Sequence, residues 1–196
     1  MGSREEILQA LRRNRPPPSE APDLAGLGVA FADPLAQLEK SVSSVGGACV
    51  RVADRAAAAA LVAALPVALG KKRIVSLVPG VGQATVDLDG VSAAHELANL
   101  DVAILPGELA VAENGAVWLD VRALHHRAVF VITDHLVLVV DAGAVVSDMH
   151  EAYARLAGRH HGTGTFISGP SKTADIEQAL VIGAQGARTC TVVVVG

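Results

Sequence analysis

The chain has 196 residues and a formal net charge of −4, and it contains one Trp, one Tyr and three Phe. That length suits one domain with a sizeable core and an appendage, and the scarcity of aromatic rings means that Val, Leu, Ile and Ala build the core. The scattered charges exclude the basic footprint of a nucleic-acid-binding protein, and no apolar run approaches the roughly 20 residues of a membrane span.

The N-terminal segment and the cysteines bear on the compartment in which the protein works. Residues 1–13 read MGSREEILQALRR and lack the apolar region of a secretory signal peptide. Cys49 and Cys190 are far apart in the sequence, and each lies in an apolar run. This favours two reduced thiols packed in the core over a disulfide framework. We therefore expect a cytoplasmic protein.

Residues 1–28 are expected to form an N-terminal arm. Ser3 and Glu6 have the spacing of a capping box, and Ile7, Leu8 and Leu11 form a narrow apolar stripe. A short amphipathic helix is therefore predicted before the run of three prolines. The segment that follows is rich in Pro, Gly, Ala and Ser. It is either a segment that wraps the domain or a partner, or a disordered linker.

Residues 29–196 are expected to form one α/β domain. Apolar positions on one helical face, between capping residues and glycines, predict helices at 34–45, 54–65, 147–157 and 173–182. Short apolar runs bounded by Gly, Pro, Asn or Asp predict strands at 48–52, 73–78, 101–105, 115–121, 128–132, 135–140, 164–168 and 189–195. The close spacing between 115 and 140 suggests antiparallel hairpins. The pattern as a whole predicts a mixed, mainly parallel sheet flanked by helices.

The segment SGPSKTADIE, residues 168–177, places a Gly-Pro bend between an expected strand and an expected helix. Gly169 lets the backbone approach a ligand closely. The free N–H groups of a helix start can hold a phosphate or a carboxylate beside the hydroxyls of Ser171 and Thr173. The segment therefore predicts a pocket for a small anion.

Two charged residues of this segment extend the hypothesis. Lys172 can add a mobile positive charge, and Asp175 is expected to point toward the loop region as a candidate catalytic carboxylate. The alternative is structural: Ser171 or Thr173 caps the helix, and Asp175 complements its dipole.

The segment SGPSKTADIE followed by a Gly-x-x-Gly loop resembles the C-terminal signature of the LUD domain family, the family of lactate-utilisation protein C. The order of expected elements from residue 35 onward is similar as well. Family members usually continue with Gly-Val-His-Gly-Pro, whereas residues 183–187 of this chain read Gly-Ala-Gln-Gly-Ala. Gln185 therefore replaces a histidine, and it can hydrogen-bond a ligand but cannot titrate.

The resemblance implies a LUD-like domain over 29–196 with a fold similar to the NagB/RpiA/CoA-transferase group. It also implies a role in oxidising L-lactate to pyruvate alongside partner subunits. The sequence has no Cys-x-x-Cys run, no dinucleotide-binding glycine motif and no P-loop. We therefore expect no cofactor on this chain, iron–sulfur clusters on cysteine-rich partner proteins, and a small anionic ligand in its own pocket.

A second motif, Glu113-Asn114-Gly115, precedes the strand expected at 115–121. LUD proteins often have Glu-Thr-Gly here, and class I CoA-transferases of similar fold have a Ser-Glu-Asn-Gly motif whose Glu attacks an acyl thioester. This chain has Ala112 in place of that serine. A functional Glu113 would be a carboxylate nucleophile or a general base, with Asn114 and Gly115 near the ligand. The alternative is an Asn-Gly turn before a strand.

The seven histidines do not predict a metal site, because none has a His-x-x-x-His spacing on an expected helix. Asp134 and His135, at the start of an expected strand, are the histidine-containing pair most suited to line a cleft.

Three functions follow from these observations. The leading hypothesis is an accessory or substrate-handling subunit of an iron–sulfur L-lactate oxidation system, with the anion pocket at SGPSKTADIE. The alternative is a stand-alone enzyme or binding protein for a CoA ester, a phosphosugar or a folate-type ligand. A third interpretation is an interaction module that docks through residues 1–28.

Overall fold

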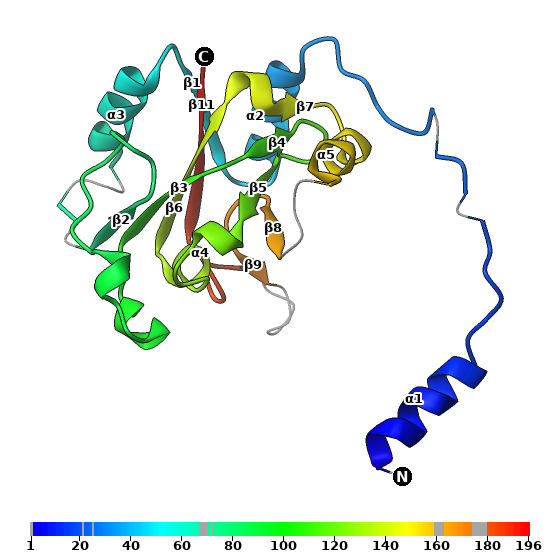
Figure 1. Ribbon diagram of the computed structural model, residues 1–196. Coiled ribbons are helices and arrows are strands. Elements are labelled where there is room, and N and C mark those ends of the chain that lie inside the picture. The colour runs from blue at the N-terminus through cyan, green and yellow to red at the C-terminus, as the bar shows by residue number, and fades with distance from the viewer. Residues whose placement is uncertain are drawn as a thin grey trace.

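The computed structural model describes the chain except for residues 1, 21, 25, 67–69, 72, 159–162 and 174–179. Helix α1 (Ser3–Arg13) stands away from the rest of the molecule at the end of an extended arm (Figure 1). The arm meets the body at Val29 and Phe31, whose backbone N–H groups donate to Asp148 and Ser147. The remaining elements pack in layers.

The central layer is a five-stranded sheet in which every neighbouring pair is parallel. Its strands, in spatial order, are β1 (Ala48–Val52), β11 (Thr189–Val195), β6 (His135–Asp141), β3 (Val102–Pro106) and β2 (Ile74–Ser76). The sequences of β6 and β11, HLVLVVD and TCTVVVV, are almost continuously apolar. This is the pattern of strands that are covered on both faces.

The two faces of the central sheet belong to different cores. Leu136 and Leu138 of β6 face a core shared with helix α2 and a second sheet. Val137 and Val139 face a smaller core under helix α3. The alternation follows from the two-residue period of a strand. The sheet therefore separates two apolar layers.

A second, four-stranded sheet covers one face of the first. In spatial order it contains β7 (Val145–Val146), β4 (Leu109–Val111), β5 (Ala116–Asp120) and β8 (Gly164–Ile167). Besides α1, the longer helices are α2 (Pro34–Ser44), α3 (Arg55–Ala64) and α5 (Met149–Leu156). Short 3-10 turns cover Leu88–Gly90, Ala94–Leu97, Val121–Ala123 and Ala142–Ala144. Helix α3 lies on one side of the central sheet, and the second sheet with α2 and α5 lies on the other (Figure 1). The expected α/β fold with a mainly parallel central sheet flanked by helices is confirmed.

The strand predicted at 128–132 is wrong, because Val129–Ile132 form the short helix α4. The N–H groups of Val131 and Ile132 both donate to the carbonyl of Ala128. Val129 is buried, whereas Val131 and Ile132 are exposed. A short apolar run does not by itself distinguish a strand from a helical turn.

The helix predicted at 173–182 is also wrong at both of its ends. Lys172–Thr173 form strand β9, which pairs antiparallel with β10 (Val181–Ile182). Residues 174–179, between the two strands, lie outside the described part. The anion pocket was expected at a helix start after Gly169, and the structure has a two-stranded ribbon there.

Smaller corrections concern caps and pairing. Asp148, not Ser147, is the N-cap of α5, and its side chain accepts the N–H of Glu151 at 2.8 Å. Helix α1 has Gly2 as its N-cap, without a side-chain capping bond. The antiparallel pairs expected within 115–140 instead join β5 to β4 and β8.

Within the described part of the chain, no helix has the length and apolar character needed to cross a membrane.

Candidate functional site

The two motifs singled out in the sequence meet in the structure. The Ser168 hydroxyl donates to the carbonyl of Asn114 at 2.7 Å, which joins the SGPSKT segment to the Glu-Asn-Gly turn. Both segments also contact the C-terminal part of α2. The Lys172 ammonium donates to the carbonyl of Val45, the residue that ends α2. Contacts between segments far apart in the sequence therefore bring the two motifs together at the C-terminal end of α2.

Two glycines allow this close approach. Gly115 has a φ of +69°, and a Cβ there would lie 2.8 Å from the backbone nitrogen of Val42. Gly169 has a φ of +72°, and its Cβ would lie 2.6 Å from the carbonyl oxygen of Val45. A larger residue at either position would meet main chain rather than a side chain that can move.

Glu113 supports helix α5 in this structure. Its Oε1 accepts the backbone N–H of Met149, the first residue of α5, at 2.9 Å. Its own N–H donates to the carbonyl of Ser147 at 3.0 Å. A carboxylate at a helix N-terminus is favoured by the free N–H groups and by the helix dipole. The side chain is exposed beside α5, so the geometry is that of a capping carboxylate.

The rest of the turn is held by hydrogen bonds of its own. The Asn114 side-chain oxygen accepts the N–H of Ala116 at 3.0 Å, as in an Asx turn. The buried Ser41 hydroxyl of α2 donates to the carbonyl of Ala112 at 2.6 Å. These contacts fit the structural alternative for Glu-Asn-Gly, a turn before a strand.

Ser171 contacts the loop 183–187. Its N–H donates to the carbonyl of Ala187 at 2.9 Å, and its carbonyl accepts the N–H of Gly183 at 2.9 Å. A Cβ on Gly186 would lie 3.1 Å from the Cβ of Ser171. The turn that contains Ser171 and the loop that contains Gln185 are therefore one unit.

A cleft of about 550 Å³ opens beside this loop. Its lining combines apolar side chains of α4, glycine backbone and a few polar groups: Ala128, Val131, Ile132, Thr133, Asp134, Gly183, Ala184, Gln185 and Gly186. Of the predicted ligand residues, Gln185 lines the cleft directly, and Ser171 holds the loop through backbone hydrogen bonds to Gly183 and Ala187. Asp134 lines it as well, and the sequence had marked this residue as suited to a cleft. Small ligands bind in such concave sites through a few placed polar groups.

Charged groups gather at the amino-terminal edge of the central sheet, next to this cleft. Arg188 Nε lies 3.6 Å from Asp134 Oδ1. His135 Nδ1 lies 2.9 Å from the Thr189 hydroxyl. Burial and the positive charge of Lys71 lower the pKa of His135 below its usual value of 6.5, and this outweighs the opposing effect of Asp134. His135 is therefore neutral near pH 7 and can donate or accept a hydrogen bond.

The structure distributes the other predicted residues more widely. Thr173 lies in β9, Lys172 points to the end of α2, and Asp175 lies outside the described residues. The sequence did not single out Thr133 or Arg188, because residues just before β6 and β11 are expected in connections. The side chains of α4 were expected in a strand and not at a site.

The cysteines and histidines form no metal site in the described part of the chain, where no three His, Cys, Asp or Glu side chains come together. Burial raises the pKa of the Cys49 thiol to about 11 and that of Cys190 to about 12. Both thiols are free. They stay protonated at neutral pH and are poor nucleophiles.

Comparison with known proteins relates this arrangement to a family. The sequence model of the LUD domain matches residues 71–195. The chain belongs to the LUD domain family. "Lactate utilization protein C" of Deinococcus radiodurans is 32% identical over 205 residues, which span all of this chain and 89% of that protein.

Two further relatives extend the comparison. The protein of the same name from Geobacillus kaustophilus is 31% identical over 123 residues, which span 60% of this chain and 48% of that protein. The crystal structure of a DUF162 family protein from Deinococcus radiodurans has a TM-score of 0.61 and 25% identity, covering 86% of this chain and 99% of that one. The LUD match includes both motifs, the cleft and strands β2 to β11, whereas β1 and α3 precede it.

Proposed function

We propose that this LUD domain protein is an accessory, substrate-handling subunit of an iron–sulfur system that oxidises L-lactate to pyruvate. The observation that carries the proposal is the similarity to a lactate utilization protein along the whole length of this chain. Similarity of that extent includes the arm, the cleft and both motifs.

Electron transfer belongs to other subunits in this proposal. An iron–sulfur cluster is held by about four thiolates. This chain has two cysteines, and burial keeps both thiols protonated. Cysteine-rich partner proteins would therefore bind the clusters, and this chain would bind the small organic acid.

The cleft beside the loop 183–187 is the site we assign to that acid. Backbone N–H groups of a glycine-containing loop and the Gln185 carboxamide suit a carboxylate and a hydroxyl group. Arg188 pairs with the cleft residue Asp134 and so brings positive charge near the cleft, part of which Asp134 balances. A weak, selective site for a small hydroxy or keto acid is expected.

Helix α1 is the element that we assign to the partner. Its residues are all at least partly exposed, and Ile7 and Leu11 are 57% and 63% exposed on one face. An apolar helical face on a long arm can enter a groove of another protein without moving the domain. Leu24 and Leu27, on the arm between α1 and the body, are exposed apolar residues as well.

Co-purification from the native host tests the partner role. Tagged wild-type protein should recover cysteine-rich iron–sulfur proteins, and the variant Ile7→Asp/Leu11→Asp should lose them. Gln9→Asp, on the opposite face of α1, should retain them. Recovery of no such partner, together with unchanged growth on lactate after deletion of the gene, would contradict the proposal.

Thermal unfolding with small ligands tests the cleft, because a ligand that binds the native state raises the unfolding temperature. L-lactate or pyruvate should raise it, and Gln185→Ala should reduce the shift. If a CoA ester, a sugar phosphate or a folate raises the unfolding temperature and neither L-lactate nor pyruvate does, the cleft binds that alternative class of ligand and not the small organic acid.

A further inference from the structure

A second concave site lies on the other side of the central sheet. It is a groove of about 500 Å³ between α3 and the loop 79–85, over strands β2 and β3. Helix α3 packs against β1 and β11, at the far side of the sheet, so it leaves this part of the sheet face partly uncovered. We name it the α3 groove. It shares no lining residue with the cleft beside residues 183–187.

The α3 groove exists because small residues face it. Ala59 and Ala63 are one helical turn apart on α3 and both line it, together with Val62. Ile74 and Ile104 of the sheet form the opposite wall. Leucines at the two alanine positions would fill much of this space.

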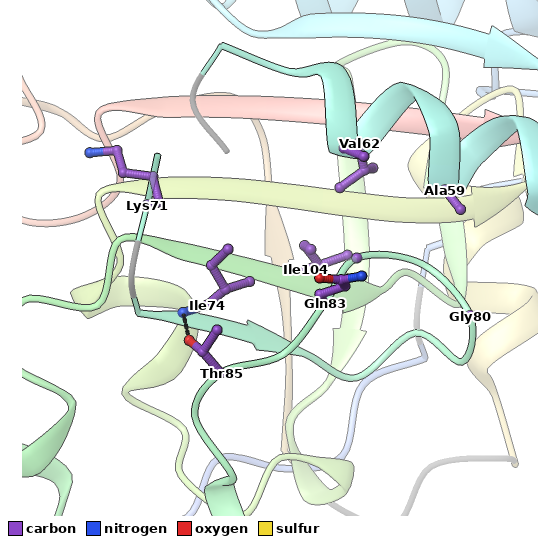
Figure 2. Close-up of a pocket in the computed structure, with 10 residues that line it drawn as sticks. Ala59, Val62, Lys71, Ile74, Gly80, Gln83, Thr85 and Ile104 are labelled. Carbon is purple, nitrogen blue, oxygen red and sulfur yellow. Dashed lines mark hydrogen bonds between the residues drawn. The ribbon is translucent and has the colours of Figure 1, made fainter. Parts of the chain in front are cut away.

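The ends of the α3 groove differ in chemistry. Figure 2 shows Lys71 at one end and Gly80 at the other, with the helix and the sheet as walls between them. The Lys71 ammonium points outward past the end of the groove, where it lies 3.4 Å from Asp101 Oδ1. Its hydrocarbon stem continues the apolar wall, so the positive charge lies at the mouth.

The remaining lining narrows the class of ligand. Gln83 and Thr85 offer polar groups along one rim, and the lining contains no aromatic ring that could stack on a planar ligand. The Thr85 hydroxyl accepts the N–H of Ile74 at 2.8 Å. The walls are aliphatic, and the Lys71 ammonium at the mouth has N–H donors beyond the one directed at Asp101. These features suit a flexible alkyl chain with a hydrogen-bond acceptor at one end, and a carboxylate there would share the Lys71 charge with Asp101.

We propose that the α3 groove binds a monocarboxylate with an apolar chain, and a groove of about 500 Å³ is large enough for a small organic ligand of this kind. The chain lies along Ala59, Val62 and Ile104, and the carboxylate lies at the mouth near Lys71. Lactate, with three carbons, is too short to fill the groove. The site is therefore additional to the proposed lactate cleft.

Calorimetric titration with butanoate, hexanoate, octanoate and decanoate tests this on the full-length protein. Affinity should rise by up to about fourfold for each methylene that the groove buries, and then level off once the groove is full. Octanol should bind more weakly than octanoate, and the variant Lys71→Met should remove that difference. No binding of octanoate at millimolar concentration would overturn the proposal.

Filling the groove provides the structural control. Ala59→Leu should lower octanoate affinity at least tenfold, whereas Ala60→Leu, on the exposed side of the same helix, should leave it unchanged. Ala63→Leu is a second filling variant should Ala59→Leu fold poorly. Octanoate binding that neither filling variant weakens would place the ligand elsewhere and overturn the proposal. The lactate cleft shares none of these positions, so either proposal can fail alone.

Discussion

At the scale of single residues, Gly115 and Gly169 decide whether the two motifs can lie against α2. Both have a positive φ, and in both cases a Cβ would meet main-chain atoms of α2 or its cap. The pair Ser168–Asn114 depends on that approach, because its hydrogen bond joins the two segments directly. These glycines are therefore required for the assembly of the site.

Gly115→Ala should lower the free energy of unfolding by about 2 to 4 kcal/mol, because the new Cβ is strained at φ +69° and collides with Val42. Urea unfolding followed by circular dichroism measures the change. Gly90→Ala is the matched control, since no atom lies within 4 Å of its Cβ position and its φ is not positive. Equal effects of the two substitutions would show that the approach at α2 does not limit stability.

At the scale of elements, Glu113 belongs to a turn between two strands and also accepts a hydrogen bond at the start of a helix. The Glu-Asn-Gly turn ends β4 and begins β5, and its carboxylate accepts an N–H at the start of α5. The turn thus contacts α2 through Ser41 and α5 through Glu113. This arrangement links three elements that are distant in sequence.

Glu113→Ala should lower the free energy of unfolding by about 0.5 to 1.5 kcal/mol, because it removes a hydrogen bond and a favourable charge at the N-terminus of α5. Glu113→Gln keeps an acceptor oxygen and should lower the free energy of unfolding by a smaller amount. Thermal or urea unfolding of both variants measures this. A loss of a detected acyl-transfer activity with unchanged stability would instead favour Glu113 as a nucleophile.

At the scale of the whole molecule, His135 makes stability depend on pH. Its pKa is lower in the folded state than 6.5, so below about pH 6.5 the unfolded chain binds more protons than the folded one. The free energy of unfolding should therefore fall as the pH decreases from 6.5 through the lower folded-state value. His135→Gln should flatten this decrease between pH 7.5 and 5, measured by urea unfolding.

The exposed His95 provides the control for that measurement. His95→Gln removes an exposed histidine in place of a partly buried one, and it should keep the wild-type pH dependence. A steep decrease that persists in His135→Gln would assign the dependence to other groups.

The arm and the domain should be independent in stability. None of the residues of α1 is buried, and the arm meets the body at Val29 and Phe31. Deletion of residues 1–28 should therefore shift the melting temperature by less than about 2 °C, measured by calorimetry. A larger loss would show that the arm packs on the domain in solution.

The apolar runs of β6 and β11, and the capping residues and glycines that bound the helices at 34–45 and 54–65, could be read from the sequence. Each depends on local steric and hydrogen-bonding preferences, which the neighbouring residues determine. Short apolar runs could not be assigned in the same way. Val129–Ile132 became a helical turn, and the ends of the expected helix at 173–182 became paired strands.

The sequence by itself therefore determined the family resemblance, the α/β class and the motif positions, because these depend on residue identity and local pattern. Only the tertiary structure decided that SGPSKT and Glu-Asn-Gly meet at the end of α2. It also decided that Glu113 caps α5, and that a cleft and the α3 groove open on different sides of the sheet. The reason is that such contacts join residues far apart in the chain, and their geometry follows from how the layers pack.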